Sequence, residues 1–139
     1  VEISRDGSSA LIDEVHEAGA IVVASFHDFE GTPGDEQLAE VLAAMNYAGA
    51  DVLKFACMAT SATDAARVIG AQAWAREAYD RPVIGIAMGE HGAPTRLVGS
   101  ALGSAATFAT LPGWEGSAPG QFTVEQVRAV LDIVEASED

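Results

Sequence analysis

The sequence has little positive charge and almost no cysteine. Its 139 residues include 7 lysines and arginines against 21 aspartates and glutamates, which gives a formal net charge of −14. A field of that sign repels phosphate backbones and anionic lipids, which argues against nucleic acids and membrane surfaces as partners. Cys57 is the single cysteine, so no internal disulfide can form, and the expected setting is a reducing cytoplasm.

Long apolar runs are also missing, so we expect no membrane-spanning segment. Lysine is nearly absent: Lys54 is the only one, and the other six basic residues are arginines. Acid enrichment with lysine avoidance favours a halophilic surface, on which salt screens the self-repulsion. An ordinary acidic protein with a chance deficit of lysine remains the alternative. Because 49% of the residues are hydrophobic, the chain is expected to fold as one compact domain and not to be disordered.

Short apolar runs alternate with longer segments of helical period. The runs begin 24 to 31 residues apart, which is the length of a repeating βα unit. Uniformly apolar strands of this kind are typical of parallel sheets that are buried on both faces. The predicted strands are residues 21–26, 51–58, 82–88 and 106–111. The predicted helix caps are Ser9, Thr32, Ser61 and Thr123, and a shorter helix is expected over 94–102.

This alternation predicts an α/β fold with a parallel sheet and right-handed crossover helices. A doubly wound sheet is possible, but the distinctive polar residues follow the carboxyl ends of several strands, which favours a (β/α)8 TIM barrel. A barrel needs roughly 250 residues, so the chain is expected to be about half of one. Residues 1–4 have the pattern of a strand end, and we expect the chain to be one piece of a larger assembly.

Lys54 lies inside a predicted strand, on the same face as Val52, Ala56 and Met58. An amine buried among apolar groups has a lowered pKa, and the neutral amine can form a Schiff base with a ketone. The alternative is a buried stem whose charged head reaches water or a carboxylate. Because the chain avoids lysine elsewhere, we favour the chemical role.

His27 ends the preceding predicted strand, so it should lie beside Lys54 at the same edge of the sheet. An imidazole there can act as a general acid and base. The alternative is a structural histidine bonded to a carbonyl or to Asp28. His27 and Asp28 have no third ligand at a recognisable spacing, so no metal site is predicted.

Two further places carry candidate binding groups. Arg96 follows a late loop of the predicted barrel, where an arginine can hold a carboxylate; a surface ion pair with Glu90 is the alternative. Ser117 and Gln121 lie on a loop that contains Pro119, and they offer a hydroxyl and an amide. That loop could equally be a plain turn that leads into the last helix.

Five separated segments together resemble type I 3-dehydroquinate dehydratase. They keep their order and spacing from about His16 onward, which is more specific than any one of them. The segments are residues 25–33 (SFHDFEGTP), the strand with Lys54, Met88-Gly89 with Thr95-Arg96-Leu97, residues 103–108 (GSAATF) and residues 117–121 (SAPGQ).

The resemblance implies a shikimate-pathway lyase, a TIM barrel that is usually a homodimer and needs no metal or organic cofactor. The enzyme would dehydrate 3-dehydroquinate to 3-dehydroshikimate through a lysine Schiff base. By this resemblance Lys54 forms the imine and His27 is the general acid/base. Arg96, Ser117 and Gln121 hold the carboxylate and hydroxyls of the substrate.

It further implies that residues 1–139 are the C-terminal half, from the end of strand 4 through strand 8 with the following helices. The glutamate that orients the histidine is then expected from an earlier strand, outside this chain. Two alternatives remain open: another Schiff-base lyase of class I aldolase type, and a non-catalytic half barrel that serves as a structural partner.

Overall fold

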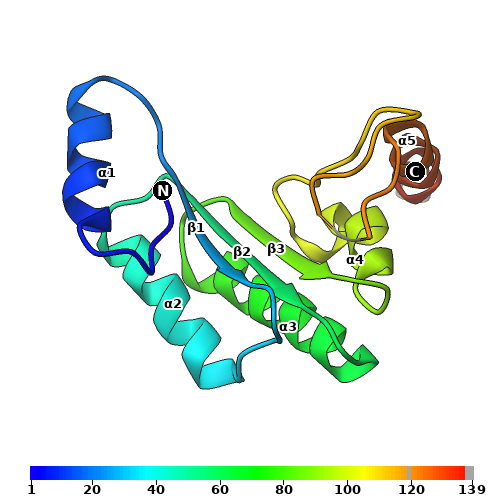
Figure 1. Cartoon of the computed structure of the whole chain (residues 1–139), viewed down its shortest axis with the longest axis horizontal. Helices are drawn as coiled ribbons and strands as arrows, with labels where there is room; N and C mark the ends of the chain where they lie inside the picture. The colour runs from blue at the N-terminus through cyan, green and yellow to red at the C-terminus, as the bar shows by residue number, and fades with distance from the viewer. Residues whose placement is uncertain (119, 137–139) are drawn as a thin grey trace.

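The computed structural model describes residues 1–118 and 120–136, so Pro119 of the predicted binding loop lies outside the described residues. Three parallel strands form one sheet in the order β1-β2-β3 (Figure 1). They are β1 (Val23–Asp28), β2 (Val52–Met58) and β3 (Val83–Met88). The helices are α1 (Ser8–Glu17), α2 (Asp35–Tyr47), α3 (Ala62–Ala78), α4 (Ala93–Val98) and α5 (Val124–Glu135), with a short 3-10 turn, η1 (Ser100–Leu102).

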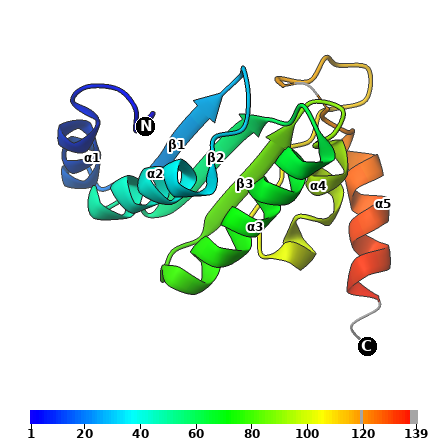
Figure 2. The ribbon, with the colours of Figure 1, turned by 90° about the horizontal axis from the view of Figure 1, so that it is seen from below.

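The two faces of the sheet have different neighbours. The crossover helices α2 and α3 lie along one face, as Figure 2 shows, and Leu53 and Phe55 of β2 are buried there with Leu42 of α2 and Val68 of α3. The opposite face carries a smaller apolar cluster of Ala56, Ile84, Ile86 and Met88. Strand alternation thus separates a helix-covered core from the face that carries Lys54.

Most predicted elements are confirmed. The strands expected at 21–26, 51–58 and 82–88 form within two residues of those limits. Ser61 caps α3 by accepting a hydrogen bond from Asp64 N, and Thr123 begins α5 with a complete capping box. The helix expected over 94–102 forms as α4 followed by η1, and it ends at Gly103, whose φ of 89° is in the left-handed region that glycine adopts readily.

Two predicted caps are wrong. Ser9 lies within α1, which begins after Gly7 without a side-chain cap. Thr32 does not cap α2 either, because that helix begins at Asp35 after Gly34. The Thr32 hydroxyl instead donates to the Met58 carbonyl, a partner 26 residues away.

The strand predicted over 106–111 is also wrong. Ala105 N donates to Val83 O at 2.8 Å, which begins a pairing with β3. The next amide along that edge, Gly85 N, donates to the side chain of Gln72 at 2.9 Å and is therefore not free to pair with a neighbouring strand. In residues 106–111, all of which are described, the one recorded pairing is an isolated bridge between Thr110 and Thr123.

The first residues extend the other edge of the sheet. Ser25 N donates to Val1 O at 2.6 Å, and Ile3 N donates to Ser25 O at 2.8 Å. These bonds make a parallel bridge between Glu2 and Ser25, which agrees with the strand end expected at residues 1–4. Among the helices of the described residues, none is long and apolar enough to cross a membrane.

Candidate active site

Lys54 and His27 meet on the face of the sheet that the crossover helices leave uncovered. In the parallel register Lys54 lies opposite Ser25, and His27 lies opposite Ala56, two residues further along. The Lys54 side chain extends toward the carboxyl end of the strands, where Nζ lies 2.7 Å from His27 Nε2. The predicted proximity of the two residues is confirmed.

Glu2 holds the other side of the imidazole. Its Oε2 lies 2.7 Å from His27 Nδ1, and its Oε1 accepts the backbone N–H of His27 at 3.2 Å. The expectation that the carboxylate beside this histidine lies outside the chain is therefore wrong. The only signal in the sequence was a single acid inside a strand-like tail, and its meaning depended on the bridge from residue 2 to residue 25.

Glu2, His27 and Lys54 form a hydrogen-bonded relay, in which the carboxylate determines which imidazole nitrogen carries the proton. A carboxylate at Nδ1 favours the tautomer in which Nδ1 carries the proton, which leaves the Nε2 lone pair facing Lys54. Burial lowers the pKa of Lys54 below that of a free lysine; the negative charge of Glu2 opposes this shift, and the positive charge of Arg96 adds to it. The amine is thus brought closer to the neutral, nucleophilic form.

A cavity of about 170 Å³ opens beside this relay. All five residues singled out in the sequence contribute to its lining, together with apolar side chains of β2, β3 and the loops outside the strands. The lining residues are His27, Phe29, Lys54, Ala56, Ile86, Met88, Arg96, Phe108, Ser117, Ala118 and Gln121.

Arg96 reaches the cavity from α4. The residue is only 4% exposed, which does not fit the surface ion pair considered for it. Burial lowers the pKa of its guanidinium from the usual value. Even so lowered, an arginine stays charged near neutral pH and supplies a positive centre for an anionic group.

Ser117 and Gln121 face each other across their loop. Gln121 Oε1 accepts the backbone N–H of Ser117 at 2.9 Å, and Gln121 Nε2 donates to Ser117 Oγ at 3.0 Å. Ser117 Oγ keeps its own hydrogen as a donor. The loop thus presents a hydroxyl and an amide to the cavity.

Two aromatic rings near the relay were missed as site residues in the sequence. The Phe29 ring is nearly parallel to the His27 ring, at 7°, with 5.9 Å between centroids. The Phe108 ring centroid lies 5.6 Å from Lys54 Nζ, within range of a cation–π contact. Both phenylalanines lie in the family-like segments, and their exposure, 63% and 42%, is a sign that they do more than fill the core.

We searched the described residues for a metal-binding group and for a nucleophile other than Lys54. In residues 1–118 and 120–136 no three histidine, cysteine, aspartate or glutamate side chains form a group that could hold a metal ion. Cys57 is buried on the opposite face, and burial raises its pKa to about 12, which keeps the thiol protonated and inert.

The fold and the site together are those of a parallel α/β protein in which an amine and an imidazole meet on the sheet face opposite the helix-covered core. The family model for type I 3-dehydroquinase matches residues 1–138. This chain belongs to the type I 3-dehydroquinase family.

Similar proteins support that assignment. The 3-dehydroquinate dehydratase of Klebsiella pneumoniae is 40% identical over 137 residues, which are 96% of this chain and 54% of the relative. That of Alkaliphilus oremlandii is also 40% identical, over 94% of this chain and 51% of its own length. The chain therefore spans about half the length of the curated relatives it matches.

Solved structures agree in fold. The crystal structure of 3-dehydroquinate dehydratase from Geobacillus kaustophilus superposes with a TM-score of 0.88 at 37% identity, covering 94% of this chain and 50% of that one. A type I 3-dehydroquinate dehydratase from Clostridium difficile, solved with covalent modified comenic acid, gives 0.83 at 32% identity, over 93% and 50%. The α/β fold is therefore that of half a TIM barrel, as predicted.

Proposed function

We propose that this chain provides the lysine, histidine and anion-binding arginine of an enzyme that dehydrates 3-dehydroquinate to 3-dehydroshikimate in the shikimate pathway. The observation that carries the proposal is the relay from Glu2 through His27 to Lys54, with 2.7 Å at each contact, beside a cavity that also contains Arg96. The covalent modified comenic acid in the structure of the Clostridium difficile relative fits chemistry of this kind.

Imine formation comes first. Neutral Lys54 attacks the substrate ketone, and the carbinolamine loses water to give a protonated imine, with His27 moving the protons. The imine withdraws electrons from the adjacent carbon, so His27 can remove a proton there. The resulting enamine expels the hydroxyl group on the next carbon in a syn elimination, and the proton now on His27 goes to that hydroxyl as water leaves. Hydrolysis of the conjugated imine then frees the product and restores Lys54.

We assign substrate binding to three other residues that line the cavity. Arg96 pairs with the substrate carboxylate, and its burial makes that pair stronger than a surface one. Ser117 and Gln121 bind the hydroxyl groups. Glu2 stabilises the imidazolium that forms whenever His27 holds the extra proton.

The complete enzyme requires a whole barrel. Residues 1–139 form its C-terminal half, from the end of strand 4 to strand 8, with segment 106–111 in the place of the last strand. The working protein is a homodimer of full barrels or a complex with the missing half, in a saline cytoplasm.

Borohydride trapping tests the function on the assembled barrel. With 3-dehydroquinate and borohydride, the peptide that contains Lys54 should gain the mass of the reduced adduct. Lys54→Met should abolish both the adduct and the dehydration. Lys54→Arg is the matched control, because it keeps a positive charge but cannot form the imine. Equal labelling of the Met variant, or an active Arg variant, would contradict the proposal, and an assembled but inactive wild-type barrel would indicate a structural role.

A further inference from the structure

The loop between β1 and α2 carries the ring that stacks on His27. Asp28 begins the loop, and its Oδ1 accepts the backbone N–H groups of Glu30 at 2.9 Å and Gly31 at 3.0 Å. This turn directs the Phe29 ring over the imidazole face. Because Phe29 is 63% exposed, packing contributes little to holding it there, and its position depends on how the loop is anchored.

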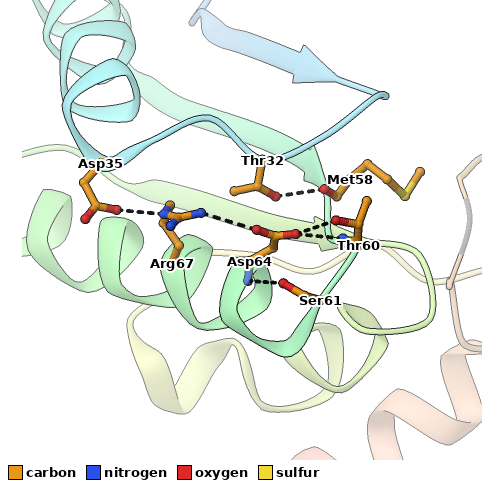
Figure 3. A network of polar contacts seen from close by, with 7 residues as sticks. All are labelled: Thr32, Asp35, Met58, Thr60, Ser61, Asp64 and Arg67. Carbon is orange, nitrogen blue, oxygen red and sulfur yellow. Dashed lines mark hydrogen bonds and ion pairs between the residues drawn. The ribbon is translucent and has the colours of Figure 1, made fainter.

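Thr32 anchors that loop to the strand that bears Lys54. Its hydroxyl donates to the Met58 carbonyl at 2.8 Å, as Figure 3 shows. The ladder between β1 and β2 ends at the pair Asp28–Cys57, so this carbonyl lies one residue beyond the last pair. The Thr32 side chain thus continues the connection between the two strands past the end of the ladder.

The segment that follows Met58 is held in place by hydrogen bonds of its own. Asp64 Oδ2 accepts two hydrogen bonds from Thr60, from the backbone N at 3.0 Å and from Oγ1 at 2.8 Å. These bonds fold the loop after Met58 onto the first turn of α3 (Figure 3). Thr32 is therefore tied to a fixed point.

A second connection joins the β1–α2 segment to α3, at a greater distance along the chain from His27 and Lys54. Arg67 donates to Asp64 at 3.3 Å and to Asp35 at 3.1 Å. Asp35 is 88% exposed, and an ion pair in that setting contributes little. Of the bonds in Figure 3, the one from Thr32 to Met58 is the cross-connection closest along the chain to both His27 and Lys54.

We propose that Thr32 is a positioning residue for the reaction assigned above, and this inference rests on that proposed function. Its hydroxyl holds the β1–α2 loop so that Phe29 fixes the His27 ring plane and keeps Nε2 at 2.7 Å from Lys54 Nζ. Proton transfer in the imine steps is sensitive to that geometry, because a small misplacement of a catalytic group slows a reaction greatly. Thr32 itself does not line the cavity, and the residues assigned to substrate binding lie on later segments of the chain, so substrate affinity should change little.

Three variants of the assembled barrel test the inference. Thr32→Val keeps the shape and removes the hydroxyl, whereas Thr32→Ser keeps the hydroxyl. Thr60→Val is the matched control, because it removes a hydroxyl hydrogen bond of the same 2.8 Å length but does not touch the β1–α2 loop, and the bond from the Thr60 backbone N to Asp64 still holds the segment after Met58. We expect Thr32→Val to lower kcat about tenfold, with KM within twofold of wild type. Thr32→Ser and Thr60→Val should stay within twofold in both constants.

The measurements separate this inference from the proposed function. If wild-type protein neither dehydrates 3-dehydroquinate nor forms the adduct, the proposed function fails. If wild type is active and Thr32→Val matches Thr60→Val in kcat, the positioning role alone is overturned. The same holds if Thr32→Ser loses as much activity as Thr32→Val, or if the loss appears in KM. Thermal melts of all variants accompany the kinetics, and a loss of kcat that vanishes once the folded fraction is equalised also overturns it.

Discussion

At the residue scale, the proposed chemistry depends on the charges of Glu2 and Arg96 that act on Lys54. Glu2 raises the pKa of Lys54, while burial and Arg96 lower it, and burial is the largest of these influences. Glu2 touches the amine only through His27, at 2.7 Å on each side. The same carboxylate therefore orients the base and keeps the amine from losing its proton too readily.

Replacing Glu2 by Gln should slow the reaction about 100-fold, because an amide no longer stabilises the imidazolium or fixes its tautomer. The variant keeps the size of the side chain, so KM should change less than kcat. Steady-state kinetics on the assembled barrel provide the measurement. Ser4→Ala is the control, since Ser4 only donates to Glu2 Oε1 at an exposed position; equal losses in the two variants would argue against the relay.

Neutralising Arg96 should raise the pKa of Lys54, because a nearby positive charge is removed. The neutral amine then forms only at higher pH, so the labelling of Lys54 by acetic anhydride should shift to higher pH in Arg96→Gln. Glu2→Gln should shift it to lower pH. Lys54 is the only lysine of this chain, so mass spectrometry of its peptide measures the effect without substrate. Shifts of the same sign in both variants would be inconsistent with this electrostatic account.

At the scale of elements, one buried side chain of α3 provides the hydrogen-bond partner for a backbone amide at the edge of β3. Gln72 is 2% exposed; its Oε1 accepts from Gly85 N, and its Nε2 donates to the Leu102 carbonyl at 2.9 Å. Glycine is needed opposite it, because a Cβ at residue 85 would lie 2.8 Å from Gln72 Oε1 and 2.9 Å from the Phe55 ring. The helix, the strand and the turn η1 are thereby joined through a single amide.

Gln72→Leu should destabilise the fold by about 2–4 kcal/mol, because it leaves two backbone groups near the core without their partner. Chemical denaturation of the assembled protein measures the change. Gln37→Leu, at an exposed site on α2, is the matched control and should change stability by less than about 0.5 kcal/mol. If the two variants are equally stable, then water or a shifted strand replaces these hydrogen bonds.

At the scale of the whole molecule, the net charge of −14 surrounds the cavity in which we propose that an anionic substrate binds. Three of the seven basic residues gather there or next to it: Lys54 and Arg96 line the cavity, and Arg5 lines an adjoining hollow with His27. The rest of the surface is dominated by acids that repel one another at low ionic strength.

The melting temperature should therefore rise with salt, by about 5 °C between 0.01 M and 1 M KCl. At 1 M the Debye length is only about 3 Å, so a screening effect should level off there. Differential scanning calorimetry or fluorimetry measures it. A melting temperature independent of salt would contradict the interpretation of a surface adapted to high salt, and a rise that continues without levelling would indicate salting-out instead.

Most of the features that the sequence determined by itself depend on residues that are close together along the chain. The apolar runs at 52–58 and 83–88, the caps Ser61 and Thr123, and the alternation that places Lys54 on the face with Ala56 all depend on residues a few positions apart. The meeting of Lys54 and His27 also followed from the sequence, because adjacent parallel strands bring their carboxyl ends to one edge.

Only the tertiary structure decided which distant groups pair. Glu2 reaches His27 across 25 residues, and Thr32 donates to Met58 across 26 instead of capping its own helix. Gln72 occupies the amide that a strand at 106–111 would have needed. In each case a polar side chain can satisfy either a local or a remote backbone group, and the choice depends on which partner the packed sheet brings within hydrogen-bond distance.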